Sequence, residues 1–226
     1  MKKLSFIFII WSLCLCKLFA QSDIETSIDS TLMVQLNTIY DEDQKYRKEI
    51  PQIIEKYGIK SPEMVAHWQL IARKDSINLL QVEEILETRG WLGEDCVGDK
   101  GSWALFLVIQ HAQLDVQEKY IPTLKQAVAD GKANAANLAL MEDRIAIRRG
   151  KPQIYGSQVG NDVETNQPFL FPILDPENLD KRRAEVGLSP YSEYLELMMG
   201  TLWDVKEYYK NLPKYEELHQ RMYPIK

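Results

Sequence analysis

Apolar residues recur every three or four positions along most of this chain, and that periodicity constrains the fold more than any other feature. The clearest case runs from residue 28 to residue 57. Its stripe contains Ile28, Leu32, Leu36, Ile39, Tyr40, Ile50, Ile54 and Tyr57. Such spacing places the apolar side chains on one face of an α-helix. Pro51 lies inside the pattern, and because proline lacks a backbone donor, we expect it to kink or split this helix, which Gly58 then ends.

The same periodicity predicts several more helices. Ser61 and Pro62 have the sequence of an N-cap followed by a first helical residue, so a helix should begin there and end before Gly90. The seven apolar residues at 103–109 are compatible with a central strand or a buried helix, and the lack of neighbouring strand patterns favours the helix. The expected helices cover residues 62–89, 102–111, 115–131, 134–149, 175–187 and a stretch that begins at 189.

Local signals refine this pattern at two places. Asp115 and Glu118 have the spacing of a capping box, which predicts the start of a helix that Pro122 disturbs. Residues 91–101 (WLGEDCVGDKG) are expected to form a loop.

One segment has a different character. Ile154, Tyr155 and Val159, and later residues 169–171, flank a Gly-Asn-Asp stretch, which predicts a short β-hairpin. Only 11 glycines and 10 prolines occur among 226 residues, which excludes collagen-like and turn-rich all-β folds. We therefore expect a mostly α protein, with a single helical domain and one short β-hairpin at residues 21–200 and a helical tail at residues 201–226 packed on it.

The N-terminus has the anatomy of a secretory signal peptide. Met1-Lys2-Lys3 is a positive segment, residues 4–16 are apolar, and the chain should be cut after Ala20. The apolar segment has 13 residues, whereas a bilayer span needs about 20. This predicts an exported protein, periplasmic or extracellular, with no stable membrane span after cleavage at residue 20. An uncleaved anchor and a lipoprotein modified at Cys14 or Cys16 are the alternatives.

Charge and cysteine content exclude several classes of function. Loss of the three lysines at positions 2, 3 and 17 takes the formal net charge from −6 to −9, so nucleic acid and anionic lipid are poor partners. Only Cys96 remains after cleavage, which excludes an intrachain disulfide, a four-cysteine zinc site and a CxxC redox pair. Cys96 is either a small buried hydrophobe or, with an activating base, a nucleophile.

Polar residues interrupt the apolar stripes at positions that should face the core. Burying a charge is costly unless it is paired, so these positions need a reason. Asp43 and Arg47 lie four residues apart in the first helix and can therefore pair. In the later helices the inward positions are occupied by Asp75, His111, Asp143 and Arg144.

These residues allow three interpretations. In the first, they line a buried polar pocket that binds a small polar or anionic ligand, with Arg47 and Arg144 as anion contacts and His111 as a donor. In the second, the chain is an envelope hydrolase in which His111 is the general base, Asp143 or Asp75 orients it, and Arg144 stabilises negative charge. In the third, the charges form a structural network with no pocket.

Motif-based chemistry is largely excluded. His111 and Asp115 have a spacing that can share a metal, but no motif supplies a third ligand, so we expect neither a metal nor a cofactor. His67 lies off the apolar stripe and should be solvated, and His219 lies in the tail. The sequence contains no GxSxG, HExxH, GxxxxGK[ST] or GxGxxG motif.

Several short motifs together resemble a bacterial family, domain-of-unknown-function family 6624. They are Asp43-Gln-x-x-Arg47, Gln110-His111, Asp143-Arg144, Gln153-x-Tyr155-Gly-Ser157-Gln158, and the stretch from Asp175-Pro176 through Arg182-Arg183 to Gly187-Leu188. Ser157 stands where the family has threonine, and Leu92 follows Gly90-Trp91 where the family has proline. The resemblance covers roughly residues 43–195.

This family has no assigned activity, so the resemblance implies no reaction. It adds three residues on the hairpin as neighbours of the helical polar set, namely Gln153, Tyr155 and Gln158. We expect them to take part in ligand binding, with the two glutamines as amide donors and acceptors.

Overall fold

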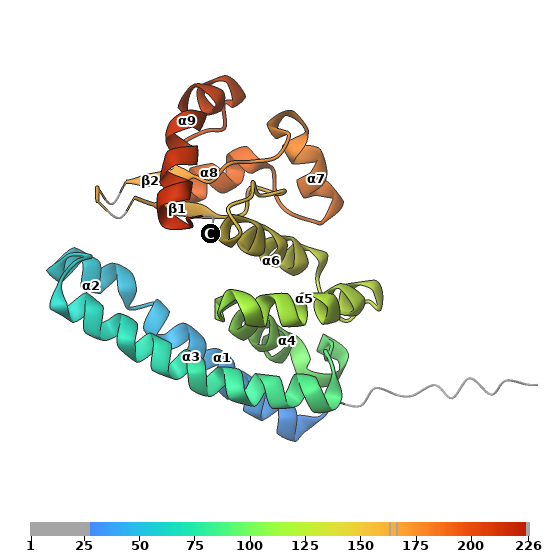
Figure 1. Ribbon diagram of the computed structural model, residues 1–226. Coiled ribbons are helices and arrows are strands. Elements are labelled where there is room, and N and C mark those ends of the chain that lie inside the picture. The colour runs from blue at the N-terminus through green and yellow to red at the C-terminus, as the bar shows by residue number, and fades with distance from the viewer. Residues whose placement is uncertain (1–27, 163, 166, 225–226) are drawn as a thin grey trace, which may run out of the picture.

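The computed structural model describes residues 28–162, 164–165 and 167–224. The expected signal peptide at residues 1–20 lies outside this part of the chain. Helices make up most of the described residues, and the sheet found among them has two short antiparallel strands (Figure 1). The predicted fold class, mostly α with one short hairpin, is confirmed.

The first three helices form an elongated arm on one side of the molecule (Figure 1). α1 spans Ser30–Arg47 and α2 spans Ile50–Tyr57. The predicted break at Pro51 is confirmed: proline occupies the first turn of α2, where the missing N–H needs no helical partner. α3 spans Pro62–Arg89, and the hydroxyl of Ser61 accepts a hydrogen bond from a backbone N–H of its first turn.

The next three helices lie between this arm and the C-terminal elements (Figure 1). α4 spans Glu94–His111, α5 spans Leu114–Ala129 and α6 spans Ala135–Arg148. The apolar run at 103–109 lies within α4, so its interpretation as a buried helix is confirmed. α4 packs chiefly on α1, and the fully buried residues of this main core include Leu36, Val82, Val97, Ala104, Leu105, Ile109, Leu124 and Met141.

Two local expectations in this layer are wrong. Residues 91–101 are not a loop: α4 begins at Glu94, and Gly98, with φ +71°, kinks the helix without ending it. Packing of the helical turn before the kink on the core accounts for this. Asp115 is not a cap, because α5 begins one residue earlier and Gln113 occupies the N-cap position without a side-chain bond. The expected helix through Pro122 is present, since α5 continues past this residue to Ala129.

The C-terminal elements lie on the far side of α6 from the arm (Figure 1). Strands β1, Val159–Asn161, and β2, Pro168–Leu170, pair antiparallel, so the predicted hairpin is present but has only three residues in each strand. A 3-10 turn and three helices follow, namely η1 Pro176–Asn178, α7 Leu179–Glu185, α8 Tyr191–Met199 and α9 Val205–Met222.

α9 is attached to the rest of this region by two small apolar clusters. Tyr208 packs with residues of β2, α7 and α8, and Leu218 packs with Ile147 of α6 and Phe171 beyond β2. In the part of the chain that the structure covers, no helix is both long and apolar enough to cross a membrane.

Candidate functional site

The histidine at the end of α4 contacts a buried aspartate of α1. The Asp43 side chain is 1% exposed, and its Oδ1 lies 2.9 Å from Nδ1 of His111. Because a carboxylate only accepts, Nδ1 of His111 donates this bond, which leaves Nε2 as the ring nitrogen available to another group. The second oxygen, Oδ2, accepts a hydrogen bond from the amide of Gln44 at 2.7 Å.

An arginine joins this pair to α3. Both terminal nitrogens of Arg47 donate to the carboxylate of Asp75, at 2.9 and 2.7 Å. Its Nη1 also lies 3.3 Å from Oδ1 of Asp43. We call Asp43, Arg47, Asp75 and His111 the polar network. It connects α1, α3 and α4, and the predicted pairing of Asp43 with Arg47 is confirmed.

The polar network is buried at one end and open at the other. Asp43 is fully enclosed, whereas the side chains of Arg47, Asp75 and His111 are 21%, 24% and 18% exposed. Burial disfavours the ionised form of Asp43, but the hydrogen bond and charge of His111, the charge of Arg47 and the amide of Gln44 outweigh it. These neighbours hold the pKa of Asp43 below its usual value.

Two further arginines lie on α6 beside this network. Nη1 of Arg148 donates to the backbone carbonyl of Ala112, the residue after His111, at 2.8 Å. Arg144 lies one helical turn earlier; its Nε is buried and has no hydrogen-bond partner among the described residues. Desolvation, together with the positive charges of Arg148 and Arg47, lowers the pKa of Arg144 to about 10. We call Arg144 and Arg148 the arginine face.

The arginine face carries positive charge that the protein does not neutralise by direct contact. Within the described ranges, neither Arg144 nor Arg148 forms an ion pair with a carboxylate, whereas Arg149, the C-cap residue of α6, pairs with Glu118. Arg148 was missed in the sequence, although its spacing of four residues from Arg144 places both on one side of α6. Unpaired guanidinium groups beside a histidine are suited to holding an anion.

Asp143 has a different role from the one expected. Its side chain is completely buried and accepts backbone N–H bonds from Ile154 at 2.6 Å, Tyr155 at 3.0 Å and Ser157 at 2.8 Å. Burial raises the pKa of Asp143, against the opposing effect of these N–H groups. The expectation that Asp143 or Asp75 orients His111 is therefore wrong, because Asp43 occupies that position and Asp75 bonds Arg47.

The hairpin residues implied by the family resemblance do not converge on His111. The amide of Gln153 is fully buried and bonds the backbone of Gln158 and Phe171, so it has no free donor for a ligand. Gln158 donates to the carbonyl and hydroxyl of Ser157. The charges that act on the Tyr155 hydroxyl come from Glu142, Asp143 and α7, not from the polar network. Gln153 thus stabilises the loop at residues 154–157 whose N–H groups donate to Asp143. The expectation that its amide binds a ligand is wrong.

A buried arginine that the apolar pattern did not indicate binds a carbonyl of the same loop, whereas Asp143 binds its N–H groups. Arg183 on α7 is 2% exposed and donates to the carbonyls of Tyr155 and Ser189, both at 2.7 Å. Its guanidinium lies 5.3 and 5.1 Å from the ring centroids of Tyr191 and Tyr194. The sequence indicated Arg183 only through the family motif, because α7 is too short to show a clear apolar stripe.

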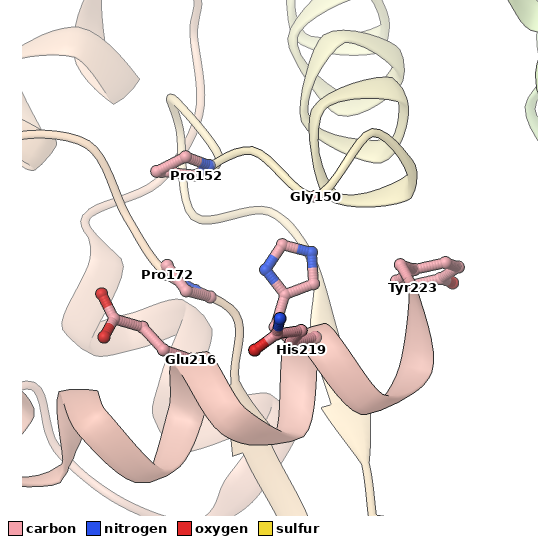
Figure 2. A pocket seen from close by; sticks show the side chains of 7 residues that line it. Gly150, Pro152, Pro172, Glu216, His219 and Tyr223 are labelled. Atoms are coloured by element: carbon pink, nitrogen blue, oxygen red, sulfur yellow. The ribbon is translucent and has the colours of Figure 1, made fainter. Parts of the chain in front are cut away.

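The other two histidines are structural. His67 is buried, contrary to expectation, and donates from Nε2 to the carbonyl of Tyr46 at 2.7 Å. His219 on α9 donates to the carbonyl of Ile147 at 2.6 Å. Figure 2 shows His219 beside a cavity of about 270 Å³ between α9 and the end of α6, lined by no member of the polar network or the arginine face. No cluster of three or more His, Cys, Asp or Glu side chains suited to a metal occurs among the described residues.

Comparison with known proteins identifies a family whose function is unknown. No curated protein and no solved structure matches the chain. A family model does match, over residues 32–206, which is most of the chain, and its description is a family of unknown function, DUF6624. The match includes most of α1 and all of α2 to α8. It therefore contains Asp43, His111, Asp143 and Arg144. Because the model matches most of the chain, including the polar network and the arginine face, the chain belongs to the DUF6624 family.

Proposed function

We propose that this protein is exported and binds a small anionic ligand between the arginine face and the polar network. The single observation that carries the proposal is that no carboxylate of the described residues pairs with Arg144 or Arg148, although burial and neighbouring positive charge make a free guanidinium unfavourable at Arg144. An anion supplied from outside would relieve that repulsion. Asp43 and Asp75 already neutralise Arg47 and His111, so they leave the α6 arginines for the ligand.

The proposed ligand carries a phosphate or carboxylate group. Guanidinium groups bind such groups through two parallel hydrogen bonds, and these charge-assisted bonds are stronger than neutral ones. Nε2 of His111, which points away from Asp43, supplies a further contact. The partial exposure of His111 provides a route by which a solute can reach the site.

Calorimetric titration of residues 21–226 with inorganic phosphate, sulfate and acetate tests the proposal. Arg144→Gln and Arg148→Gln should each weaken binding about tenfold or more, since a charge-assisted bond contributes about 1.5–3 kcal/mol. Arg149→Gln is the matched control, because Arg149 directly follows Arg148 at the C-cap of α6 but pairs with Glu118. Absence of saturable binding of any of these anions, or equal weakening by the control substitution, would contradict the proposal.

A hydrolase is the second candidate, and one observation favours it. The 2.9 Å contact between Asp43 and His111 fixes the ring so that Nε2 can accept a proton from water, as a general base must. Arg144 and Arg148 would then stabilise the negative charge that develops on an attacked ester or phosphoester.

Turnover measured across pH separates this candidate from simple binding. A hydrolase should convert chromogenic carboxylic and phosphoric esters with a rate that depends on pH, as general-base catalysis does, and His111→Gln should abolish it. Binding of phosphate without turnover of any ester would favour the binding protein.

Export is tested separately from the site. We propose cleavage after Ala20 and residence in the periplasm or outside the cell, which the charged, apolar and small-residue order of residues 1–20 supports. Sequencing of the N-terminus of the protein purified from its natural host should begin at Gln21. A protein that begins at Met1 would contradict the proposal.

A further inference from the structure

A second cavity, distant in sequence from the polar network, lies between α8 and the start of α9. It has a volume of about 300 Å³, and three aromatic residues line it, namely Trp203, Tyr208 and Tyr215. The carboxylates of Asp204 and Glu207 belong to the same lining, which includes no lysine, arginine or histidine. The cavity therefore combines π-electron surfaces with negative charge.

The aromatic rings are arranged as adjoining walls. The ring centroids of Trp203 and Tyr208 lie 5.2 Å apart with planes inclined at 52°, and those of Tyr208 and Tyr215 lie 6.1 Å apart at 36°. Tyr208 is held in place from behind, because its hydroxyl accepts a hydrogen bond from the N–H of Ile173 at 2.8 Å. The three rings are therefore inclined to one another rather than stacked flat, and Tyr208, only 3% exposed, lies at the buried end of the cavity.

The acidic groups at this cavity differ in their availability. Asp204 is occupied as the N-cap of α9, where it accepts N–H bonds from Lys206 and Glu207. The Glu207 side chain is exposed, and bonds from Asn211 and Lys210 keep its pKa below the usual value, so it is ionised at neutral pH. Glu207 is the exposed carboxylate of this lining; Lys210 shares its charge at 3.3 Å, so Glu207 adds to the attraction of the aromatic rings for a cation and does not supply it alone.

We propose that this cavity binds a small organic ammonium cation, with a quaternary ammonium group favoured over a primary one. Aromatic faces attract cations through their quadrupoles, and clusters of aromatic side chains are the usual means of recognising quaternary ammonium. The aliphatic side chains of Leu195 and Met199 complete the lining and suit methyl groups better than N–H donors. This site is independent of the proposed anion site.

Calorimetric titration of residues 21–226 with tetramethylammonium and choline tests the inference, and 3,3-dimethylbutan-1-ol serves as the uncharged analogue of choline. We expect saturable binding of both cations. The neutral alcohol should bind about tenfold more weakly, because it keeps the shape and loses the charge. Ethanolamine, a primary ammonium, should bind more weakly than choline.

Two substitutions identify the site. Glu207→Gln and Trp203→Leu should each weaken choline binding several-fold, and Trp203→Phe should restore part of the affinity because it restores a ring. Glu193→Gln is the matched control, an exposed carboxylate on α8 outside the cavity. A thermal unfolding curve for each variant identifies any that fails to fold, and Glu207→Gln, an exposed change, keeps the test valid in that case.

Some outcomes would overturn the inference. They are the absence of saturable choline binding, equal binding of choline and its neutral analogue, and equal loss in the Glu193→Gln control. If choline binds, sedimentation with phosphatidylcholine vesicles identifies its source: co-sedimentation supports a lipid headgroup as the cation, and a protein that stays in solution supports a free solute.

Discussion

The regions around Asp43 and Asp143 each bury an aspartate completely, but they satisfy it in different ways. Asp43 contacts side chains, His111 and Arg47, that are themselves partly exposed. Asp143 contacts backbone N–H groups of a loop whose Tyr155 carbonyl is in turn bonded by Arg183. Partners that reach solvent can exchange protons or bind a solute, whereas backbone partners can only hold the chain. The comparison separates a candidate site from a structural anchor, although both carry motifs of one family.

The largest effect is expected for the structural anchor. Asp143→Ala leaves the buried N–H groups of Ile154, Tyr155 and Ser157 without an acceptor, and should lower the free energy of unfolding by about 3 kcal/mol or more. Urea unfolding monitored by circular dichroism measures this. A loss below about 1 kcal/mol would remove the distinction between the two aspartates.

Asp43→Asn should have a smaller effect, about 2 kcal/mol at pH 7, because its charged partners can turn to solvent. The effect should also depend on pH. The pKa of Asp43 is lowered from 3.8, so its stabilisation is complete well above pH 3.8 and is lost as the pH falls through the lower folded value.

Urea unfolding between pH 3 and pH 7 checks this dependence. The difference in stability between the wild type and Asp43→Asn should shrink toward pH 3. The pKa of Asp143 is raised, so its contribution falls as the pH rises from 3.8 through the folded value, and the difference for Asp143→Asn should widen toward pH 3. The same trend for both variants would contradict the comparison.

His111→Gln should lower the free energy of unfolding by about 1 kcal/mol, the contribution of one hydrogen bond at a half-buried position. It should nevertheless weaken phosphate binding. His67→Gln is the control, because His67 also donates one bond, to the backbone carbonyl of Tyr46, and belongs to neither the polar network nor the arginine face. A loss of about 3 kcal/mol or more for His111→Gln in thermal unfolding would instead favour a purely structural network.

The smallest effect on stability is expected for Arg144→Gln, a gain of no more than about 0.5 kcal/mol over the wild type. The substitution removes a desolvated cation that repels Arg148 and Arg47, and residues kept for binding often reduce stability. Thermal unfolding in phosphate-free buffer measures it. Addition of phosphate should raise the melting temperature of the wild type and leave that of Arg144→Gln nearly unchanged.

The helices were predictable because their signals are local. The cap at Ser61, the start of a helix near residue 134 and the break before Pro51 depend on residues within one turn. The error at residues 91–101 has the opposite origin: that segment lacks apolar periodicity, and its helical turn is stabilised by Val97 in the core. The sequence also contained no local signal that limits each strand to three residues.

The polar network was predictable as a set of residues but not as a set of contacts. Inward positions on separate helices identified Asp43, Arg47, Asp75 and His111, since a charge on an apolar stripe is visible in the sequence. Which aspartate contacts His111 was not visible. Asp43 is 68 residues away from it, and Asp143, the expected partner, faces a different loop.

The sequence by itself determined the helical class, the helix faces and the polar positions on them, because periodicity and capping act between neighbours in the chain. Only the tertiary structure decided how these positions pair, since the packing angles of α1, α4 and α6 determine which charges come within hydrogen-bond distance. Across the described part of the chain, that packing left Arg144 and Arg148 without a carboxylate partner and enclosed Asp143 among backbone groups. Charge pairing is a property of distances in space, and a sequence read along the chain does not contain them.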